Sequence, residues 1–205
     1  KTKMRGPDAQ QVVETEFGYL GFARLAIMGL TPDGMQPFQR DGSWVICNGE
    51  IYGFRKIKKE LEERGYQFQS GSDCEVLLPL YEEYGLEMFS HLDAEYACVL
   101  YDHKSGKLIA ARDQIGIRPL FYGYSKSGKI AFASEAKNLI GWVDEVRAFP
   151  PGSYYYDGKF VKYEDIAAVH GYVHEDIDVI TKNIHDKLTE GVKKRLDADA
   201  PLGFL

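Results

Sequence analysis

The sequence predicts a layered α+β fold, because strand pairs and amphipathic helices occur in blocks rather than in strict alternation. Apolar runs at residues 96–102 and 107–112 are joined by a short turn containing Gly106. Two similar pairs follow, at residues 120–124 with 130–134 and at residues 153–156 with 159–163. Strands joined by so few residues pair in antiparallel fashion. We therefore expect antiparallel sheets covered by helices rather than a parallel doubly wound sheet.

Length and charge restrict the classes of function. The 205 residues can bury one substantial core, and the formal net charge is −6 with no block of Lys or Arg. This balance argues against nucleic acid and against an anionic membrane surface as partners. No apolar run is long enough to span a bilayer, and the first residues do not resemble a signal peptide. We expect a cytoplasmic protein with no membrane partner.

The segment 44–73 holds the first candidate site. The apolar strand 44–47 runs into Asn48-Gly49-Glu50, which would be a hairpin turn if a return strand followed. A half-buried helix beginning at Phe54 and ending before Gly65 follows instead, so we predict a polar turn. The side chain of Asn48 and the backbone N–H of Gly49 could then form an oxyanion hole, in which fixed donors stabilise developing negative charge.

A second polar turn precedes the next helix. Ser72 with Glu75 three residues later is a capping-box pattern, and the apolar face of the predicted helix extends to Tyr84 before Gly85. We expect Asp73 to lie in this turn. The two polar turns would then meet at the ends of neighbouring helices.

One cation and three thiols interrupt apolar segments. Arg24 lies within the strand pattern of residues 17–28, so it either forms a structural salt bridge or binds an anionic ligand. Three cysteines form an odd set without paired spacing, as expected of reduced thiols. Cys47 and Cys98 are interpreted as buried and inert. Cys74 lies at a helix start, which can lower a thiol pKa, but we interpret it as structural too.

The remaining segments are predicted to be loops, a short helix at residues 135–140 and one long helix. We expect loops for residues 1–16, for 112–119 as a surface loop with an Arg–Asp pair, and for the linker 167–176. The histidines of the linker, four residues apart, are expected to be exposed, with no metal site. Residues 177–196 form an amphipathic helix whose apolar stripe is predicted to be core rather than partner-binding. Residues 200–205 would enter a buried strand of a further domain.

Seven motifs, taken together, resemble those of glutamine-hydrolysing asparagine synthetases and occur in the same order. The resemblance covers essentially all of residues 4–205. The motifs are Arg5-Gly6-Pro7-Asp8, Ala23-Arg24-Leu25-Ala26-Ile27, Asn48-Gly49-Glu50-Ile51-Tyr52, Ser70-Gly71-Ser72-Asp73-Cys74-Glu75, Arg112-Asp113-Gln114-Ile115-Gly116-Ile117-Arg118-Pro119-Leu120, Ala133-Ser134-Glu135 and Phe149-Pro150-Pro151-Gly152-Ser153.

This resemblance implies a class II glutamine amidotransferase domain of the N-terminal-nucleophile hydrolase fold, a four-layer αββα sandwich of two stacked antiparallel sheets. It assigns residues 1–166 to the glutaminase domain, lacking its N-terminal segment, and residues 177–205 to the start of a truncated synthetase domain. In such enzymes an N-terminal cysteine attacks glutamine with its own α-amino group as base. The released ammonia passes to the second domain, which converts aspartate to asparagine with ATP and Mg²⁺ through β-aspartyl-AMP. Family members are often homodimers.

The resemblance also implies roles for individual residues. Arg24 would hold the α-carboxylate of glutamine, and Glu50 and Asp73 its α-ammonium group. Asn48 and Gly49 would donate to the oxyanion. None of the three cysteines matches the position of the nucleophile, so the chain by itself is expected to be inactive. ATP and Mg²⁺ are expected to bind beyond this chain, which should hold no cofactor of its own.

Two alternatives come from other functional classes. One is the cysteine-less scaffold domain of an ATP-dependent ligase related to β-lactam synthetase, and the other is a glutamine-sensing or purely structural domain. A scaffold has no need of a set of charges that matches glutamine. The presence of Arg24, Asn48, Glu50 and Asp73 together therefore favours the glutaminase.

Overall fold

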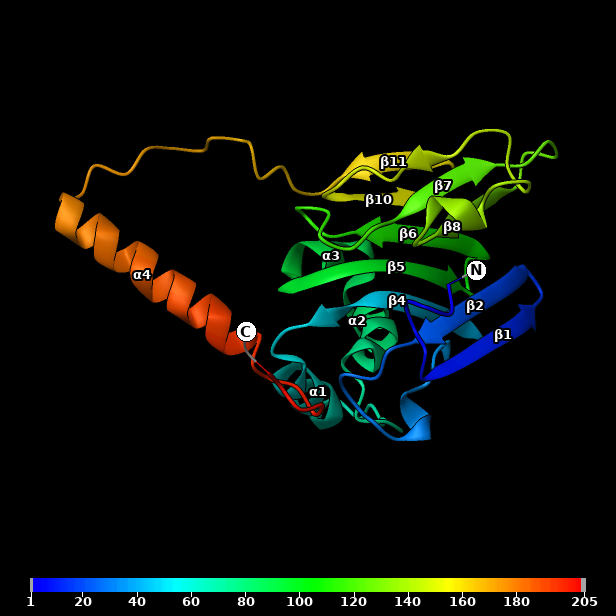
Figure 1. The fold of residues 1–205 in the computed structure, drawn as a ribbon, viewed down its shortest axis with the longest axis horizontal. Coiled ribbons are helices and arrows are strands. Elements are labelled where there is room, and N and C mark those ends of the chain that lie inside the picture. The colour runs from blue at the N-terminus through cyan, green and yellow to red at the C-terminus, as the bar shows by residue number, and fades with distance from the viewer. Residues whose placement is uncertain (1, 204–205) are drawn as a thin grey trace.

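A computed structural model describes residues 2–203, and its centre is an antiparallel sheet (Figure 1). Six strands of the described residues form this sheet in the order β11-β10-β6-β5-β4-β3. The strands are β3 (Phe38–Arg40), β4 (Ser43–Ile51), β5 (Ala94–Asp102), β6 (Lys107–Arg112), β10 (Ser153–Tyr156) and β11 (Lys159–Lys162).

Alternation along the central strands creates two separate cores. On one face, Val45 and Cys47 of β4 pack with the helices α1 (Phe54–Glu63), α2 (Leu77–Tyr84) and α3 (Met88–His91). Short 3₁₀ turns, η2 (Asp73–Val76) and η3 (Gly85–Glu87), flank α2 on either side. On the other face, Ile46 belongs to a second core around Phe149. The central sheet is therefore covered on both faces.

Smaller antiparallel sheets complete the fold. β7 (Phe121–Tyr124), β8 (Ile130–Ala133) and β9 (Arg147–Ala148) form one sheet, and β1 (Ala9–Thr15) pairs with β2 (Gly18–Arg24). Tyr122 and Phe132 of the three-stranded sheet pack against the second core, so sheet stacks on sheet. The predicted α+β class with stacked antiparallel sheets is confirmed, and residues 2–203 supply three of the four expected layers.

Several local predictions are wrong. Residues 9–15 form a strand rather than a loop, because they pair along their whole length with β2. Residues 48–50 are not a turn: β5 extends to Ala94 and pairs with β4 as far as Ile51, so the strand continues through the Asn-Gly step. Residues 135–140 contain one 3₁₀ turn, η4 (Ala136–Asn138), where a short helix was expected. A further 3₁₀ turn that was not predicted is η1 (Pro32–Gly34).

The capping-box prediction is also wrong. Ser72 makes no side-chain capping bond at the start of η2. Glu75 reaches back instead to the backbone N–H groups of Gln69 and Ser70, at 2.7 and 2.9 Å. The carboxylate therefore shapes the turn before Asp73 rather than the helix start.

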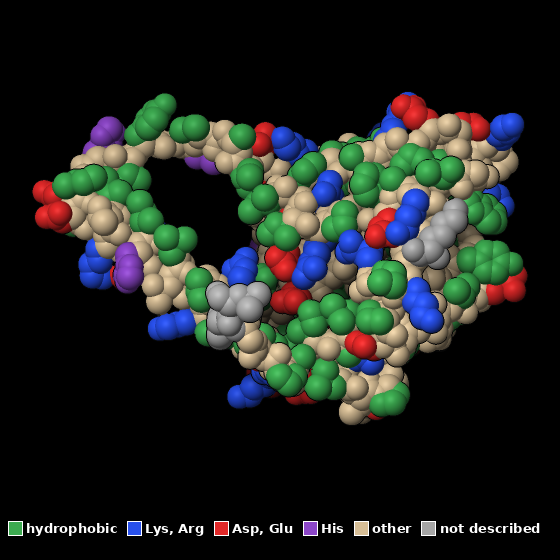
Figure 2. All heavy atoms as spheres, in the orientation of Figure 1, with side chains coloured by type: hydrophobic (Ala, Val, Ile, Leu, Met, Phe, Trp, Pro, Cys, Tyr) green, Lys and Arg blue, Asp and Glu red, His purple; other side chains and the backbone are tan. Residues whose placement is uncertain are grey.

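The C-terminal helix α4 (Ile177–Lys194) forms as predicted, but its apolar stripe is not core. Ile184 and Leu188 are 55% and 66% exposed, and hydrophobic side chains are visible along the helix (Figure 2). Residues 167–176 lack helix and strand, as expected of a linker, and both of its histidines are exposed. Residues 200–203 form no strand, and 204–205 lie outside the described residues. No helix within residues 2–203 is long and apolar enough to cross a membrane.

Candidate active site

A cavity of about 420 Å³ lies where β4, the end of β2, η2 and the loop before β7 converge. This volume is within the usual range for small-molecule sites. All five residues assigned from the resemblance line it, namely Arg24, Asn48, Gly49, Glu50 and Asp73. Segments far apart in sequence therefore meet around one space, as a shared ligand requires.

Asn48 and Glu50 enter the cavity from the same strand. They are two residues apart on β4, so they project from the same face of the sheet. Among the described residues, Nδ2 of Asn48 is buried and has no hydrogen-bond partner. A buried donor without a partner costs about 1–3 kcal/mol, so natural proteins rarely keep one without a function. Donation from Asn48 to a ligand atom stays a prediction.

Gly49 allows the two central strands to approach closely at this point. A Cβ there would lie 2.4 Å from the carbonyl oxygen of Glu95 and 2.7 Å from Cα of Tyr96, so no side chain fits. The thiol of Cys74 donates to the Gly49 carbonyl at 3.8 Å. The donor role of the Gly49 N–H stays a prediction.

Two carboxylates mark the acidic side of the cavity. Asp73 is 5% exposed and accepts a hydrogen bond from the backbone N–H of Ile51 at 2.8 Å. Burial raises the pKa of Asp73 above its ordinary value. Burial also raises the pKa of Glu50, opposed by Arg118 and reinforced by the charges of Glu95 and Asp73. A cationic ligand would relieve the repulsion between these carboxylates.

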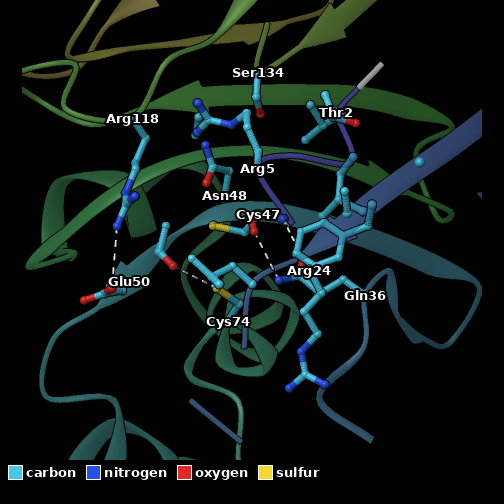
Figure 3. Close-up of a pocket in the computed structure, with 18 of the residues that line it drawn as sticks. Thr2, Arg5, Arg24, Gln36, Cys47, Asn48, Glu50, Cys74, Arg118 and Ser134 are labelled. Atoms are coloured by element: carbon cyan, nitrogen blue, oxygen red, sulfur yellow. Dashed lines mark hydrogen bonds and ion pairs between the residues drawn. The ribbon is translucent and has the colours of Figure 1, made fainter. Parts of the chain in front are cut away.

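Arg118 is a site residue that the sequence reasoning did not assign. Its Nη2 lies 2.7 Å from Glu95 and 3.5 Å from Glu50, and its Nε is buried without a partner among residues 2–203 (Figure 3). Glu50 and Glu95 are directly opposite each other on β4 and β5. Like charges directly opposite each other on neighbouring strands are destabilising. The need for a positive charge near Glu50 and Glu95 is therefore the signal that could have identified Arg118.

The loop carrying Arg118 is not the predicted surface loop with an Arg–Asp pair. Asp113 is 1% exposed and accepts hydrogen bonds from five backbone N–H groups. One of these is the N–H of Arg118, at 3.0 Å. The side chain of Arg112 donates to three carbonyl oxygens, those of Gly116, Arg118 and Phe149. Both charged side chains therefore organise the backbone that places Arg118.

Arg24 is buried, and its guanidinium holds the loop that follows β2. Nη1 donates to the carbonyl oxygen of Thr31 at 2.8 Å, while Nη2 donates to those of Met28 and Gly29. In Figure 3 its side chain extends away from Asn48. Arg24 thus forms backbone hydrogen bonds where a salt bridge was one of the expectations, and carboxylate binding remains a prediction.

The three cysteines are buried and free. Cys74 lines the cavity, but a hydrogen bond with Cys47, burial and the charge of Asp73 raise its pKa well above the ordinary value. A thiol whose pKa is raised is a poor nucleophile. None of the three side chains is suited to attack a substrate in this cavity.

Further polar groups line the cavity beside Asn48. Arg5 comes from the N-terminal segment and Ser134 from the residue after β8, and both are drawn near Asn48 in Figure 3. The cavity therefore carries cationic, acidic and neutral donor groups, which suits a zwitterionic ligand with a polar side chain.

Comparison with known proteins identifies the family. A family model described as a glutamine amidotransferase domain matches residues 1–158. A probable glutamine-hydrolysing asparagine synthetase of Acanthamoeba polyphaga mimivirus is 41% identical over 234 residues, covering 100% of this chain and 42% of that protein. Asparagine synthetase B of Escherichia coli strain K12 is 34% identical over 213 residues, covering 98% of this chain and 37% of that protein.

A solved structure agrees with these matches. Glutamine phosphoribosylpyrophosphate amidotransferase from B. subtilis, in complex with ADP and GMP, superimposes with a TM-score of 0.60 at 25% identity. The match covers 72% of this chain and 35% of that chain. Our chain spans about two fifths of the length of the two curated relatives. By its sequence and its fold, the chain belongs to the glutamine amidotransferase domain family.

Proposed function

We propose that this chain is the glutamine-binding, ammonia-releasing part of a glutamine-hydrolysing asparagine synthetase. The observation that carries the proposal is the buried Nδ2 of Asn48, which has no partner within residues 2–203 and faces a cavity lined by carboxylates and arginines. Such a donor is suited to the oxygen of a substrate amide as that oxygen becomes negative.

In the proposed mode of binding, the α-ammonium group of glutamine lies between Glu50 and Asp73. Its α-carboxylate meets Arg24, and its side-chain amide reaches Asn48 and the N–H of Gly49. The attacking group is a thiolate that none of the chain's own cysteines provides, because all three are buried. These residues therefore bind and orient the amide and stabilise the oxyanion, while the nucleophile comes from elsewhere.

The remaining functions of the whole protein are part of the same proposal. Ammonia would pass to an ATP-dependent domain, beginning near residue 177, that amidates aspartate in the presence of Mg²⁺. No group of three or more metal-ligating side chains occurs among the described residues. We further propose a cytoplasmic homodimer; the free cysteines are in keeping with a reducing compartment.

The alternative of a cysteine-less scaffold is less well supported. Both curated relatives described above carry the name of glutamine-hydrolysing enzymes. A scaffold would also gain nothing from an unpartnered buried amide in a polar cavity.

Calorimetric titration of the 205-residue chain with L-glutamine tests the proposal directly. Without a reactive thiol the chain should bind glutamine and leave it intact, so binding can be measured free of turnover. D-glutamine and L-asparagine are the matched controls, because they alter the α-carbon configuration and the chain length. Equal heats for all three ligands, or none for L-glutamine, would contradict the proposal.

A further inference from the structure

The residues that follow α4 return to the body of the protein and attach to the loop after β2. Oδ2 of Asp199 accepts a hydrogen bond from the N–H of Gly29 at 2.8 Å. The N–H groups of Asp199 and Ala200 both donate to the carbonyl oxygen of Ile27 at 3.1 Å. Three hydrogen bonds thus join segments about 170 residues apart in sequence.

Ion pairs with α1 hold the returning segment in place. Nη2 of Arg55 lies 3.0 Å from Asp197 and 3.1 Å from Asp199. The hydrogen bond from Gly29 and the contact with Arg55 lower the pKa of Asp199, so its carboxylate is charged at neutral pH. In Figure 1 the C-terminal segment lies beside α1. We call residues 197–200 the latch.

The end of α4 contacts the body at the same place. Lys194 forms an ion pair with Asp93 at 2.7 Å, and the guanidinium carbon of Arg195 lies 4.6 Å from the centre of the Tyr52 ring. Exposed pairs of this kind contribute little individually. Together with the latch they define the position at which the chain leaves α4 and meets α1, the residue after β4 and the residue before β5.

Gly29 connects the latch to the glutamine site. Its φ is +56°, and a Cβ there would lie 2.5 Å from the backbone nitrogen of Ser72, so the turn carrying Asp73 packs directly on it. Its carbonyl oxygen accepts a hydrogen bond from Nη2 of Arg24. One peptide segment therefore contacts Asp199 on one side and, on the other, both Arg24 and the turn of Asp73, the two parts of the proposed site that would hold the α-carboxylate and the α-ammonium group.

We propose that Asp199 is a positioning residue for glutamine binding, acting through Gly29 on Arg24 and on the turn of Asp73. The inference rests on the proposed function of the cavity. Because coupling between two sites is reciprocal, glutamine should in turn tighten the latch. The latch follows the helix that we expect to begin the second domain, so it would link that domain to occupancy of the glutamine site.

The test measures the latch and the glutamine site separately. Amide hydrogen exchange of residues 27–31 reports on the latch, and titration calorimetry reports the Kd for L-glutamine. In Asp199→Ala, exchange of residues 27–31 should become faster and the Kd should rise about fivefold or more. Asp199→Asn keeps an acceptor for the Gly29 N–H and should bind glutamine within about twofold of the parent chain.

Two further variants guard against unfolding and nonspecific effects. Arg55→Ala removes an exposed side chain and weakens the latch without touching the cavity, so it should shift exchange and Kd in the same direction as Asp199→Ala. Asp165→Ala, at a carboxylate that is 44% exposed and paired with Lys162, is the matched control and should change neither quantity.

The outcomes separate the inference from the function on which it rests. Unchanged exchange in both latch variants overturns the latch. Faster exchange with an unchanged Kd overturns the coupling to glutamine. A parent chain that binds no glutamine overturns the proposed function and the coupling with it, while faster exchange at residues 27–31 in the latch variants would still show the latch itself.

Discussion

Arg118 lies between two acidic residues that face each other across the central sheet, with Nη2 2.7 Å from Glu95 and 3.5 Å from Glu50. The Coulombic effect of Arg118 opposes the rise in the pKa of Glu50 that burial and the neighbouring carboxylates produce. The arginine therefore helps to keep Glu50 charged, and a charged Glu50 is what an ammonium group requires.

The affinity for glutamine should depend on pH in the acidic range. The folded-state pKa values of Glu50 and Asp73 lie above the ordinary values of 4.5 and 3.8. The ligand-free folded protein thus holds more protons than the unfolded chain in this window and loses stability as pH rises through it. The Kd for glutamine should fall over the same window and level off above the raised pKa values. Titrations from about pH 4 to 8 check this; a Kd independent of pH would contradict it.

Replacing Arg118 should move this pH dependence. Arg118→Gln removes the larger of the two positive charges that lower the pKa of Glu50 and leaves only that of Arg195, so the pKa of Glu50 should rise further. We expect the midpoint of the Kd profile to shift upward by about one pH unit. Arg147→Gln, which removes an exposed arginine paired with Glu145, is the control and should leave the midpoint in place. Coincident profiles for the two variants would exclude Arg118 from the site.

Arg24 can be tested with ligands that lack one charge. If its guanidinium binds the α-carboxylate, the parent chain should prefer L-glutamine over the α-carboxamide of glutamine, and Arg24→Ala should lose most of that preference. The Kd for glutamine should rise by about tenfold or more, as expected when a charge-assisted pair is removed. If Arg24 only supports the loop of Met28, Gly29 and Thr31, the variant would melt at a lower temperature and discriminate between the ligands as before.

Asn48→Ala should separate catalysis from stability. Loss of an oxyanion donor should lower the kcat of the full-length enzyme by about a hundredfold or more and change KM much less. Because Nδ2 is buried without a partner among residues 2–203, its removal should leave the free energy of unfolding unchanged or slightly higher. Ammonia release and urea denaturation measure the two quantities. A destabilised variant with a normal kcat would instead indicate a structural amide.

The sequence predicted correctly those elements that depend on neighbouring residues. It was misleading where pairing with a strand distant in sequence determines the structure. Short glycine turns predicted three of the hairpins, β5–β6, β7–β8 and β10–β11, and Phe54 with Gly65 marked the ends of the first helix, because these features depend on neighbouring residues. The Asn48-Gly49 step is typical of a turn. The strand continues there, however, because β5 pairs with β4 as far as Ile51. Local residue propensity does not determine strand pairing of this kind.

The candidate site likewise contains residues that the sequence could identify and one that it could not. The family resemblance assigned Arg24, Asn48, Gly49, Glu50 and Asp73 to one site, and all five line one cavity, although no spacing rule joins these segments. Arg118 was not assigned, because its role depends on the cross-strand register that puts Glu50 opposite Glu95. The periodicity of α4 predicts a core face, yet Ile184 and Leu188 are exposed, because periodicity shows that a face is apolar but not what covers it.

Replacing Asp113 should lower the free energy of unfolding by a large amount. Its carboxylate accepts hydrogen bonds from five backbone N–H groups, among them that of Arg118, and is 1% exposed. Asp113→Ala leaves those buried donors unpaired, so unfolding in urea should require at least about 3 kcal/mol less free energy. Asp165→Ala, at a carboxylate that is 44% exposed and paired with Lys162, should cost less than about 1 kcal/mol.

The same substitution should also disturb the site through Arg118. Asp113→Asn keeps one acceptor oxygen, so it should fold well enough for titration while its loop is less firmly placed. Its Kd profile for glutamine should shift toward higher pH, as in Arg118→Gln, because Glu50 loses part of the nearby positive charge. An Asp113→Asn variant that is destabilised but keeps the parent pH midpoint would show that Arg118 is held by its ion pairs alone. The loop would then be structural, and the position of Arg118 independent of it.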